Sequence, residues 1–107
     1  MVNYQLGKIY KIECFTTGLV YYGATCEPTL ARRLAGHKSN YERYKTGKSK
    51  VYNHSFETLK HNNYAISLVE LHPCETKDEL SARERYHILN NDCVNKQKPL
   101  GNCPLTD

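Results

Sequence analysis

Two short segments near the start of the chain flank a glycine-containing turn, and this feature constrains the fold more than any other. Residues 7–13 alternate in hydrophobicity, residues 19–24 are rich in β-branched and aromatic side chains, and the turn 16–18 contains a glycine. Segments of this kind usually pair as an antiparallel β-hairpin. Alternation along the first segment places Tyr10 on the same face as Ile12. The sequence therefore predicts a hairpin that carries tyrosines.

A helix is expected after the hairpin, because Pro28 suits the first turn of a helix and Thr25 or Glu27 can cap it. At roughly 100° per residue, one stripe of this helix faces inward. The stripe consists of Leu30, Leu34, His37 and Tyr41. Arg33 lies at the edge of the stripe and Arg32 on the opposite side, so we expect Arg33 to face inward.

The middle of the chain predicts a second helix and a third strand. Residues 46–48 contain a glycine and interrupt the first helix. Ser49 can cap a helix that runs to about residue 61, with apolar residues at helical spacing. Residues 64–71 alternate and are flanked by polar residues, which is typical of a strand.

A third helix is expected from the cap Thr76 to about residue 91, because Glu79 three residues later completes a capping-box pattern. Residues 92–107, with two prolines and a glycine, are expected to be irregular. The order of elements predicts an α+β fold: one three-stranded antiparallel sheet flanked by about three helices. At 107 residues, positions 1–107 are expected to form a single domain.

Positive charge is concentrated in residues 32–50, where seven basic residues face one acid and give a local charge of +6, against +4 for the whole chain. A patch of this kind attracts a polyanion, and nucleic acid is the commonest candidate. A solvated helix face and loop is the alternative. Besides Arg33, the basic residues are Arg32, Lys38, Arg43, Lys45, Lys48 and Lys50.

Other features bear on the class of protein. No apolar run approaches a membrane span, and the first residues do not resemble a signal peptide, so we expect a protein that does not enter a membrane and is intracellular, either cytoplasmic or nuclear. The five cysteines include no Cys-x-x-Cys pair, which argues against a disulfide framework and a zinc knuckle. A zinc site would need His72 or His87 with Cys93 and Cys103, whose spacing is poor.

Several side chains could carry chemistry. Glu84 lies between Leu80 and Ile88 on one predicted helical stripe, and a buried carboxylate usually has a cationic partner or a metal. The alternative is a salt bridge to a neighbouring arginine, Arg83 or Arg85, or a carboxylate at the exposed end of the stripe. Arg33 and His37 lie one turn apart on one face, which places a phosphate ligand beside a base that titrates near neutrality. Packing of His37 in the core is the alternative there.

Tyrosine is abundant, with nine in 107 residues. Tyr10 and Tyr21 lie on the predicted paired strands, where tyrosine often serves only to fill the core. A phenol held near a phosphodiester can instead relay or accept a proton. Both interpretations stand on the residues alone.

Together these segments resemble the GIY-YIG endonuclease superfamily. Lys8-Ile9-Tyr10 stands at the position of the first motif, and Tyr21-Tyr22-Gly23 stands at that of the second. The spacing of eleven residues between Tyr10 and Tyr21 is typical of this family. Lys8 replaces the first glycine, and Tyr22 replaces the isoleucine of the second motif. The further matches follow in family order: Arg33, His37, Glu84 and Asn95.

The resemblance implies a Mg²⁺-dependent DNA endonuclease, with Mn²⁺ as a substitute ion, that leaves a 5′ phosphate and a 3′ hydroxyl. It implies that Glu84 binds the metal, Tyr10 activates water, and Arg33 clamps the phosphate. Tyr21 and His37 would assist at the phosphate and in proton transfer, and Asn95 would support the site. Lys8 and the basic residues 32–50 would contact DNA without reading its sequence.

Specificity would then come from a homodimer, a separate DNA-recognition partner, or DNA shape. The alternative to an enzyme is a nucleic-acid-binding module that keeps this fold and cleaves nothing.

Overall fold

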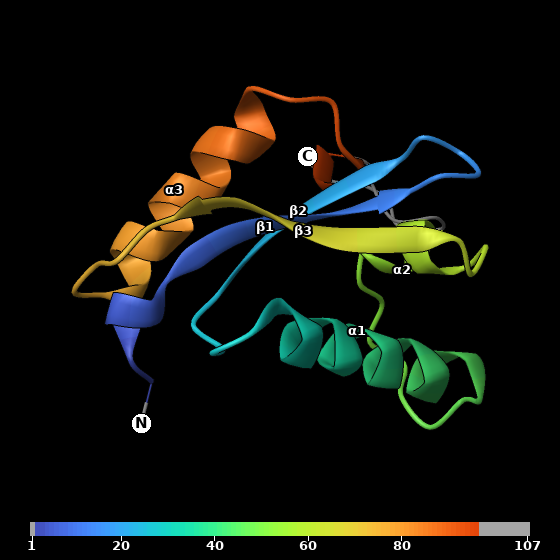
Figure 1. Cartoon of the computed structure of the whole chain (residues 1–107). Coiled ribbons are helices and arrows are strands. Elements are labelled where there is room, and N and C mark those ends of the chain that lie inside the picture. The colour runs from blue at the N-terminus through green and yellow to red at the C-terminus, as the bar shows by residue number, and fades with distance from the viewer. Residues whose placement is uncertain (1, 97–107) are drawn as a thin grey trace, which may run out of the picture.

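The computed structural model describes residues 2–96 and has a three-stranded antiparallel sheet at its centre (Figure 1). Strand β1 (Lys8–Cys14) lies in the middle, with β2 (Val20–Thr25) on one side and β3 (Tyr64–Leu71) on the other. Helices α1 (Leu30–Lys45) and α3 (Lys77–Leu89) lie on opposite sides of this sheet. The predicted α+β fold is confirmed.

The hairpin forms as predicted. The Gly18 backbone has φ of 78°, a conformation that glycine adopts without steric cost, and its N–H donates to the Cys14 carbonyl over 2.8 Å. In the β1–β2 register Tyr10 lies opposite Gly23, and Ile12 lies opposite Tyr21. Because cross-strand partners share a face, both tyrosines belong to the face covered by α1.

Helix α1 begins later than predicted. Its N-cap is Thr29, whose hydroxyl accepts a hydrogen bond from the Arg32 N–H, so the prediction of Thr25 or Glu27 was wrong. The Thr25 hydroxyl is occupied by the Glu27 N–H in the preceding turn. The inward stripe is confirmed: His37 is buried, and Leu30, Leu34 and Tyr41 pack on the core.

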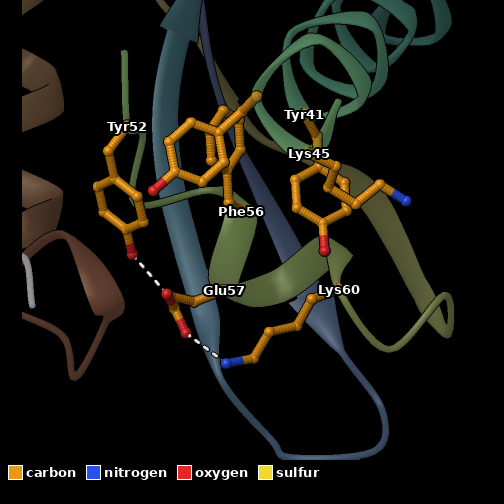
Figure 2. A pocket seen from close by; sticks show the side chains of 7 residues that line it. Tyr41, Lys45, Tyr52, Phe56, Glu57 and Lys60 are labelled. Carbon is orange, nitrogen blue, oxygen red and sulfur yellow. Dashed lines mark hydrogen bonds and ion pairs between the residues drawn. The ribbon is translucent and has the colours of Figure 1, made fainter. Parts of the chain in front are cut away.

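The predicted helix over 49–61 is mostly absent. Only α2 (Phe56–Leu59) forms, preceded by a turn in which the Asn53 side chain accepts the Ser55 N–H. This side chain offers the backbone an alternative to helical hydrogen bonds. Val51, one of the apolar residues at helical spacing in this stretch, is exposed. Phe56, another of them, is buried and is surrounded by tyrosine rings (Figure 2).

Helix α3 has the predicted capping box between Thr76 and Glu79 and ends at Leu89 rather than near residue 91. The chain also forms two 3-10 helices, η1 (Tyr4–Leu6) and η2 (Val94–Lys96). Val94, in the stretch expected to be irregular, is fully buried and η2 packs against β2. Residues 97–107 of that stretch lie outside the described residues.

The described helices include none that combines the length and apolarity needed to cross a bilayer.

Candidate active site

The Tyr10 hydroxyl is the centre of a buried polar cluster between β1 and α1. Its side chain is fully buried, and its oxygen lies 2.6 Å from His37 Nε2 and 3.1 Å from Arg33 Nε. Arg33 can only donate, so the Tyr10 oxygen accepts from Arg33 and its own proton points to His37. Arg33 is thus the inward arginine of α1, whereas Arg32 is exposed and pairs with Glu27.

Gly23 allows this placement of Tyr10. A Cβ atom at Gly23 would lie 2.5 Å from Tyr10 Cζ and would overlap the hydroxyl. Only glycine therefore leaves room for the phenol ring to cross β2. The second motif and the first meet in space at this contact.

His37 is held in one tautomer by Ser55. The Ser55 hydroxyl lies 3.0 Å from His37 Nδ1, and both side chains are fully buried. Since Nε2 accepts from Tyr10, Nδ1 carries the ring proton and donates to Ser55. Burial and the Arg33 charge lower the pKa of His37 to about 4, so the imidazole is neutral near pH 7.

Tyr21 completes this side of the cluster. Its ring meets His37 edge-on, with centroids 5.5 Å apart, and the Asn53 side chain lowers the pKa of its hydroxyl. Burial raises the pKa values of both Tyr10 and Tyr21, so both phenols are protonated near pH 7. The Arg33 charge lowers the pKa of Tyr10, but by less than burial raises it.

Sequence reasoning missed Ser55 and Asn53. Both lie in the stretch predicted as helix, where their side chains would have had other directions. Each interacts with a residue more than fifteen positions away, and the local spacing of residues does not predict such a contact. The turn at residues 53–55 is the feature that directs them toward the site.

Glu84 on α3 belongs to the same electrostatic neighbourhood. Its carboxylate raises the pKa values of Tyr10 and Tyr21. Burial raises the pKa of Glu84 itself, and the charges of Arg33 and Arg85 lower it by less. Among residues 2–96, no hydrogen bond or ion pair engages the Glu84 side chain, so the alternative of a salt bridge to Arg83 or Arg85 is not observed there. Glu84 is thus a half-buried carboxylate beside an arginine and two phenols.

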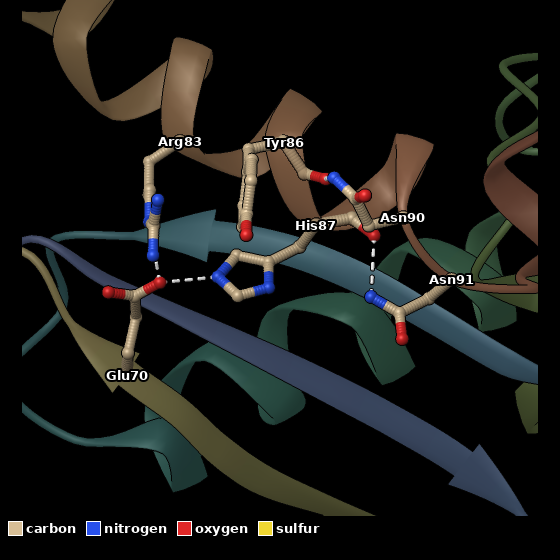
Figure 3. Close-up of polar contacts among 6 residues, drawn as sticks. All are labelled: Glu70, Arg83, Tyr86, His87, Asn90 and Asn91. Atoms are coloured by element: carbon tan, nitrogen blue, oxygen red, sulfur yellow. Dashed lines mark hydrogen bonds and ion pairs between the residues drawn. The ribbon is translucent and has the colours of Figure 1, made fainter.

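A second polar cluster fixes α3 against the sheet (Figure 3). Glu70 on β3 accepts from Arg83 Nε over 2.6 Å and forms a short hydrogen bond with His87 Nε2. The His87 ring also stacks on Tyr22, with centroids 6.2 Å apart. Because Arg83 and His87 bracket Glu84 in sequence, this cluster sets the position of the Glu84 carboxylate relative to the sheet. No pattern in the sequence predicted that Glu70 would bind Arg83 and His87.

Asn95 contacts the edge of the sheet. Its side chain accepts the Tyr22 N–H over 2.9 Å and donates to the Tyr22 carbonyl over 2.7 Å. Both the oxygen and the nitrogen of the amide therefore form hydrogen bonds with the Tyr22 backbone, between Tyr21 and Gly23. Asn95 positions the second motif by closing the exposed edge of β2.

Lys8 has a different environment from the one expected of a DNA contact. It is 8% exposed, and its ammonium donates to the Leu6 and Glu27 carbonyls, each over 2.6 Å. Lys8 thus ties β1 to the loop before α1 with two of its three ammonium donors.

The basic residues of 32–50 other than Arg33 are exposed: Arg32, Lys38, Arg43, Lys45, Lys48 and Lys50. They do not all face the Tyr10 cluster. Lys38 and Lys45 line a hollow with Tyr64 of β3, whereas Arg33 projects toward Tyr10. The positive charge therefore extends around α1 rather than forming one patch beside the site.

Across residues 2–96, no three His, Cys, Asp or Glu side chains gather as they would in a site with several protein ligands. His87 of the zinc hypothesis is paired with Glu70, and Cys103 lies outside the described residues. A metal bound through one carboxylate and otherwise through water or substrate needs no such cluster, and this is how proteins often hold Mg²⁺.

In a comparison with protein families, residues 6–97 match the model of the GIY-YIG catalytic domain. That range includes both tyrosine motifs, α1 and the helix that carries Glu84. Comparisons with curated proteins and with solved structures gave no significant match.

Proposed function

The chain belongs to the GIY-YIG family, whose catalytic domain indicates a nuclease, and on this premise we propose that it is a Mg²⁺-dependent DNA endonuclease. The expected products carry a 5′ phosphate and a 3′ hydroxyl. The observation that carries the proposal is the Tyr10 hydroxyl, which is shared by Arg33 and His37 and is coupled electrostatically to an unpaired Glu84.

The Glu84 environment supports a divalent cation. A half-buried carboxylate without a protein partner among the described residues has acceptor capacity to spare, and burial raises its pKa. A cation would relieve the cost of burying this charge. Glu84 would hold Mg²⁺, with Mn²⁺ as a substitute, and the ion would supply Lewis-acid stabilisation of negative charge on the phosphate.

Arg33 is suited to the scissile phosphate. The Tyr10 contact uses Nε, so the two terminal nitrogens of the guanidinium remain as donors toward the site. A planar, permanently charged fork of this kind binds two phosphate oxygens at once. Arg33 would thereby offset charge that grows as water attacks phosphorus.

Tyr10 and His37 support a proton relay. Tyr10 would take a proton from the attacking water while it passes its own to His37 Nε2, and Ser55 would accept from the Nδ1–H of the imidazolium. The water oxygen bonds to phosphorus, the bond from phosphorus to O3′ breaks, and solvent supplies the proton of the 3′ hydroxyl. Because burial disfavours both a free phenolate and a free imidazolium, we propose that the two transfers are concerted.

The exposed basic side chains around α1 would contact the DNA backbone. Contacts of this type position DNA without reading its bases and give binding that weakens steeply with salt. Recognition of a particular site, and cutting of both strands, would require a second copy of the chain, a separate partner, or rebinding.

A cleavage assay on end-labelled DNA tests the proposal. Linear, supercoiled, flap and junction substrates are incubated with Mg²⁺, with Mn²⁺, and with a chelator, and the ends of the products are identified. Metal-dependent products with a 5′ phosphate are expected. Salt-dependent binding to these substrates without any cleavage would favour the binding-module alternative.

A further inference from the structure

A second hollow lies on the far side of the segment that carries Asn53 and Ser55. It has a volume of about 550 Å³ and is lined by four aromatic side chains: Tyr41, Tyr44, Tyr52 and Phe56. Figure 2 shows the rings of Tyr41, Tyr52 and Phe56, with Glu57 joined to Tyr52 and Lys60 joined to Glu57. This volume is in the range of small-molecule sites in proteins.

The aromatic rings offer faces to a flat ligand. Phe56 forms the floor, with its ring centroid 5.2 Å from those of Tyr41 and Tyr44 and 5.7 Å from that of Tyr52. Tyr44 is 39% exposed, so part of its ring is open to a ligand. Nucleobases stack on such rings in a way that depends little on sequence.

Two lysines at the hollow can meet a phosphate. Lys60 pairs with Glu57 over 2.9 Å, and Lys45 pairs with Glu42 over 3.0 Å while lying over the Tyr41 ring. Exposed pairs of this kind contribute little to stability, so a phosphate can replace the carboxylate. The Glu57 carboxylate also accepts from the Tyr52 hydroxyl, which stabilises its negative charge and lowers its pKa.

The segment 52–56 links the hollow to the candidate active site. Tyr52 and Phe56 line it, whereas Asn53 and Ser55, which lie between them in sequence, contact Tyr21 and His37. A smaller hollow of about 230 Å³ shares Asn53 with the site and Phe56 with the aromatic hollow. A strand that leaves the site along this route would meet the aromatic rings.

We propose that the hollow binds an unpaired nucleotide of the nucleic-acid substrate, with its base on the tyrosine rings and its phosphate at Lys45 or Lys60. This inference rests on the proposed function and specifies its substrate class: DNA with a single-stranded segment next to the scissile phosphate. Paired bases are already stacked within the duplex, so the hollow selects unpaired ones.

Binding of single-stranded DNA to the full chain tests the proposal. The Glu84→Gln background removes cleavage, and Tyr44→Leu removes the exposed stacking face while leaving an apolar side chain on Phe56. The matched control is Tyr86→Leu, because Tyr86 is 50% exposed on α3 and does not line the hollow. The probes are a labelled single-stranded oligonucleotide, the same strand with abasic nucleotides, and a duplex of equal length.

Tyr44→Leu is expected to weaken binding of the single strand about tenfold, and to leave binding of the duplex and the abasic strand unchanged. Tyr86→Leu is expected to bind all three probes as the background does. Equal affinity of Tyr44→Leu and Tyr86→Leu for the single strand would overturn the proposal, and an apolar protein segment would then be the better occupant.

The double variant Lys45→Gln/Lys60→Gln keeps the test valid if Tyr44→Leu fails to fold. It is expected to reduce the salt slope of single-strand binding by about 0.7, and an unchanged slope counts against the hollow. Failure of the proposed function is recognised separately: Tyr44-dependent binding without cleavage by the unmodified chain keeps the nucleotide site and refutes the nuclease. If the unmodified chain cleaves DNA but its single-strand binding does not depend on Tyr44, the nuclease stands and the nucleotide site is refuted.

Discussion

Tyr10 and Gly23 face each other across β1 and β2, and the phenol ring of Tyr10 fills the space that a side chain at position 23 would take. The contact joins the two tyrosine motifs in one structural unit. It brings the Tyr10 hydroxyl to Arg33 and His37 on α1. Glycine at position 23 is thus a requirement of the site as well as of the strand.

Gly23→Ala is expected to lower the rate of DNA cleavage about 100-fold, because displacing a group at the reaction centre by about 1 Å has an effect of this size. The added Cβ would overlap the Tyr10 ring, and overpacking of this kind should also reduce the free energy of unfolding by about 1–3 kcal/mol. The measurements are the nicking rate and the denaturant midpoint of the variant.

Gly36→Ala is the matched control for that variant. A Cβ at Gly36 would lie 3.9 Å from Arg33 Nη1, an ordinary van der Waals contact that leaves the guanidinium in place, and alanine favours the helix by about 1 kcal/mol. This variant should be slightly more stable and cleave at the normal rate. Gly23→Ala behaving like Gly36→Ala would contradict the proposed contact.

Ser55→Ala is expected to destabilise the protein by about 1–3 kcal/mol, since it leaves the buried His37 Nδ1–H without an acceptor. It should also slow cleavage, because the imidazole tautomer that accepts from Tyr10 is no longer enforced. Chemical denaturation and nicking rates measure the two effects. Ser49→Ala, which removes an exposed hydrogen bond from the same loop, should change neither by much, and equal effects of the two substitutions would count against Ser55.

The stability of the protein should fall as the pH decreases from about 6.5 to 4. His37 has a pKa of about 4 in the fold against 6.5 for an unperturbed histidine, so between these values the unfolded chain binds the proton more readily. The loss attributable to His37 is about 3 kcal/mol once both states are protonated. His37→Gln should lack this part of the pH dependence, as followed by denaturation midpoints. Parallel curves for the variant and the unmodified protein would show that His37 is not buried in neutral form.

The fold was largely predictable, because its strands and helices carry local signals. The glycine turn predicted the hairpin, and the pair Thr76 and Glu79 predicted the start of α3. The prediction of a helix was wrong for residues 49–55. The apolar residues there have helical spacing, but the Asn53 side chain accepts the Ser55 N–H and forms a turn. The helical stripe identified Arg33 rather than Arg32 as the inward arginine.

The site was predictable only in part, because its geometry depends on contacts between distant segments. Tyr10, Arg33 and His37 were found by spacing and family resemblance. The partners that hold them, Ser55 and Gly23, act through burial and close approach, which the sequence does not display. Lys8 shows the opposite case: its charge suggested DNA, but two backbone carbonyls bind its ammonium.

The central claim is that Glu84 serves the same reaction centre as Tyr10 and Arg33. The most direct measurement is the Mg²⁺-dependent nicking rate of supercoiled DNA by Glu84→Gln, compared with Glu75→Gln, which changes an exposed carboxylate just before α3. We predict loss of nicking by the folded Glu84→Gln protein and a normal rate for Glu75→Gln. Nicking at the normal rate by a well-folded Glu84→Gln variant would contradict the account.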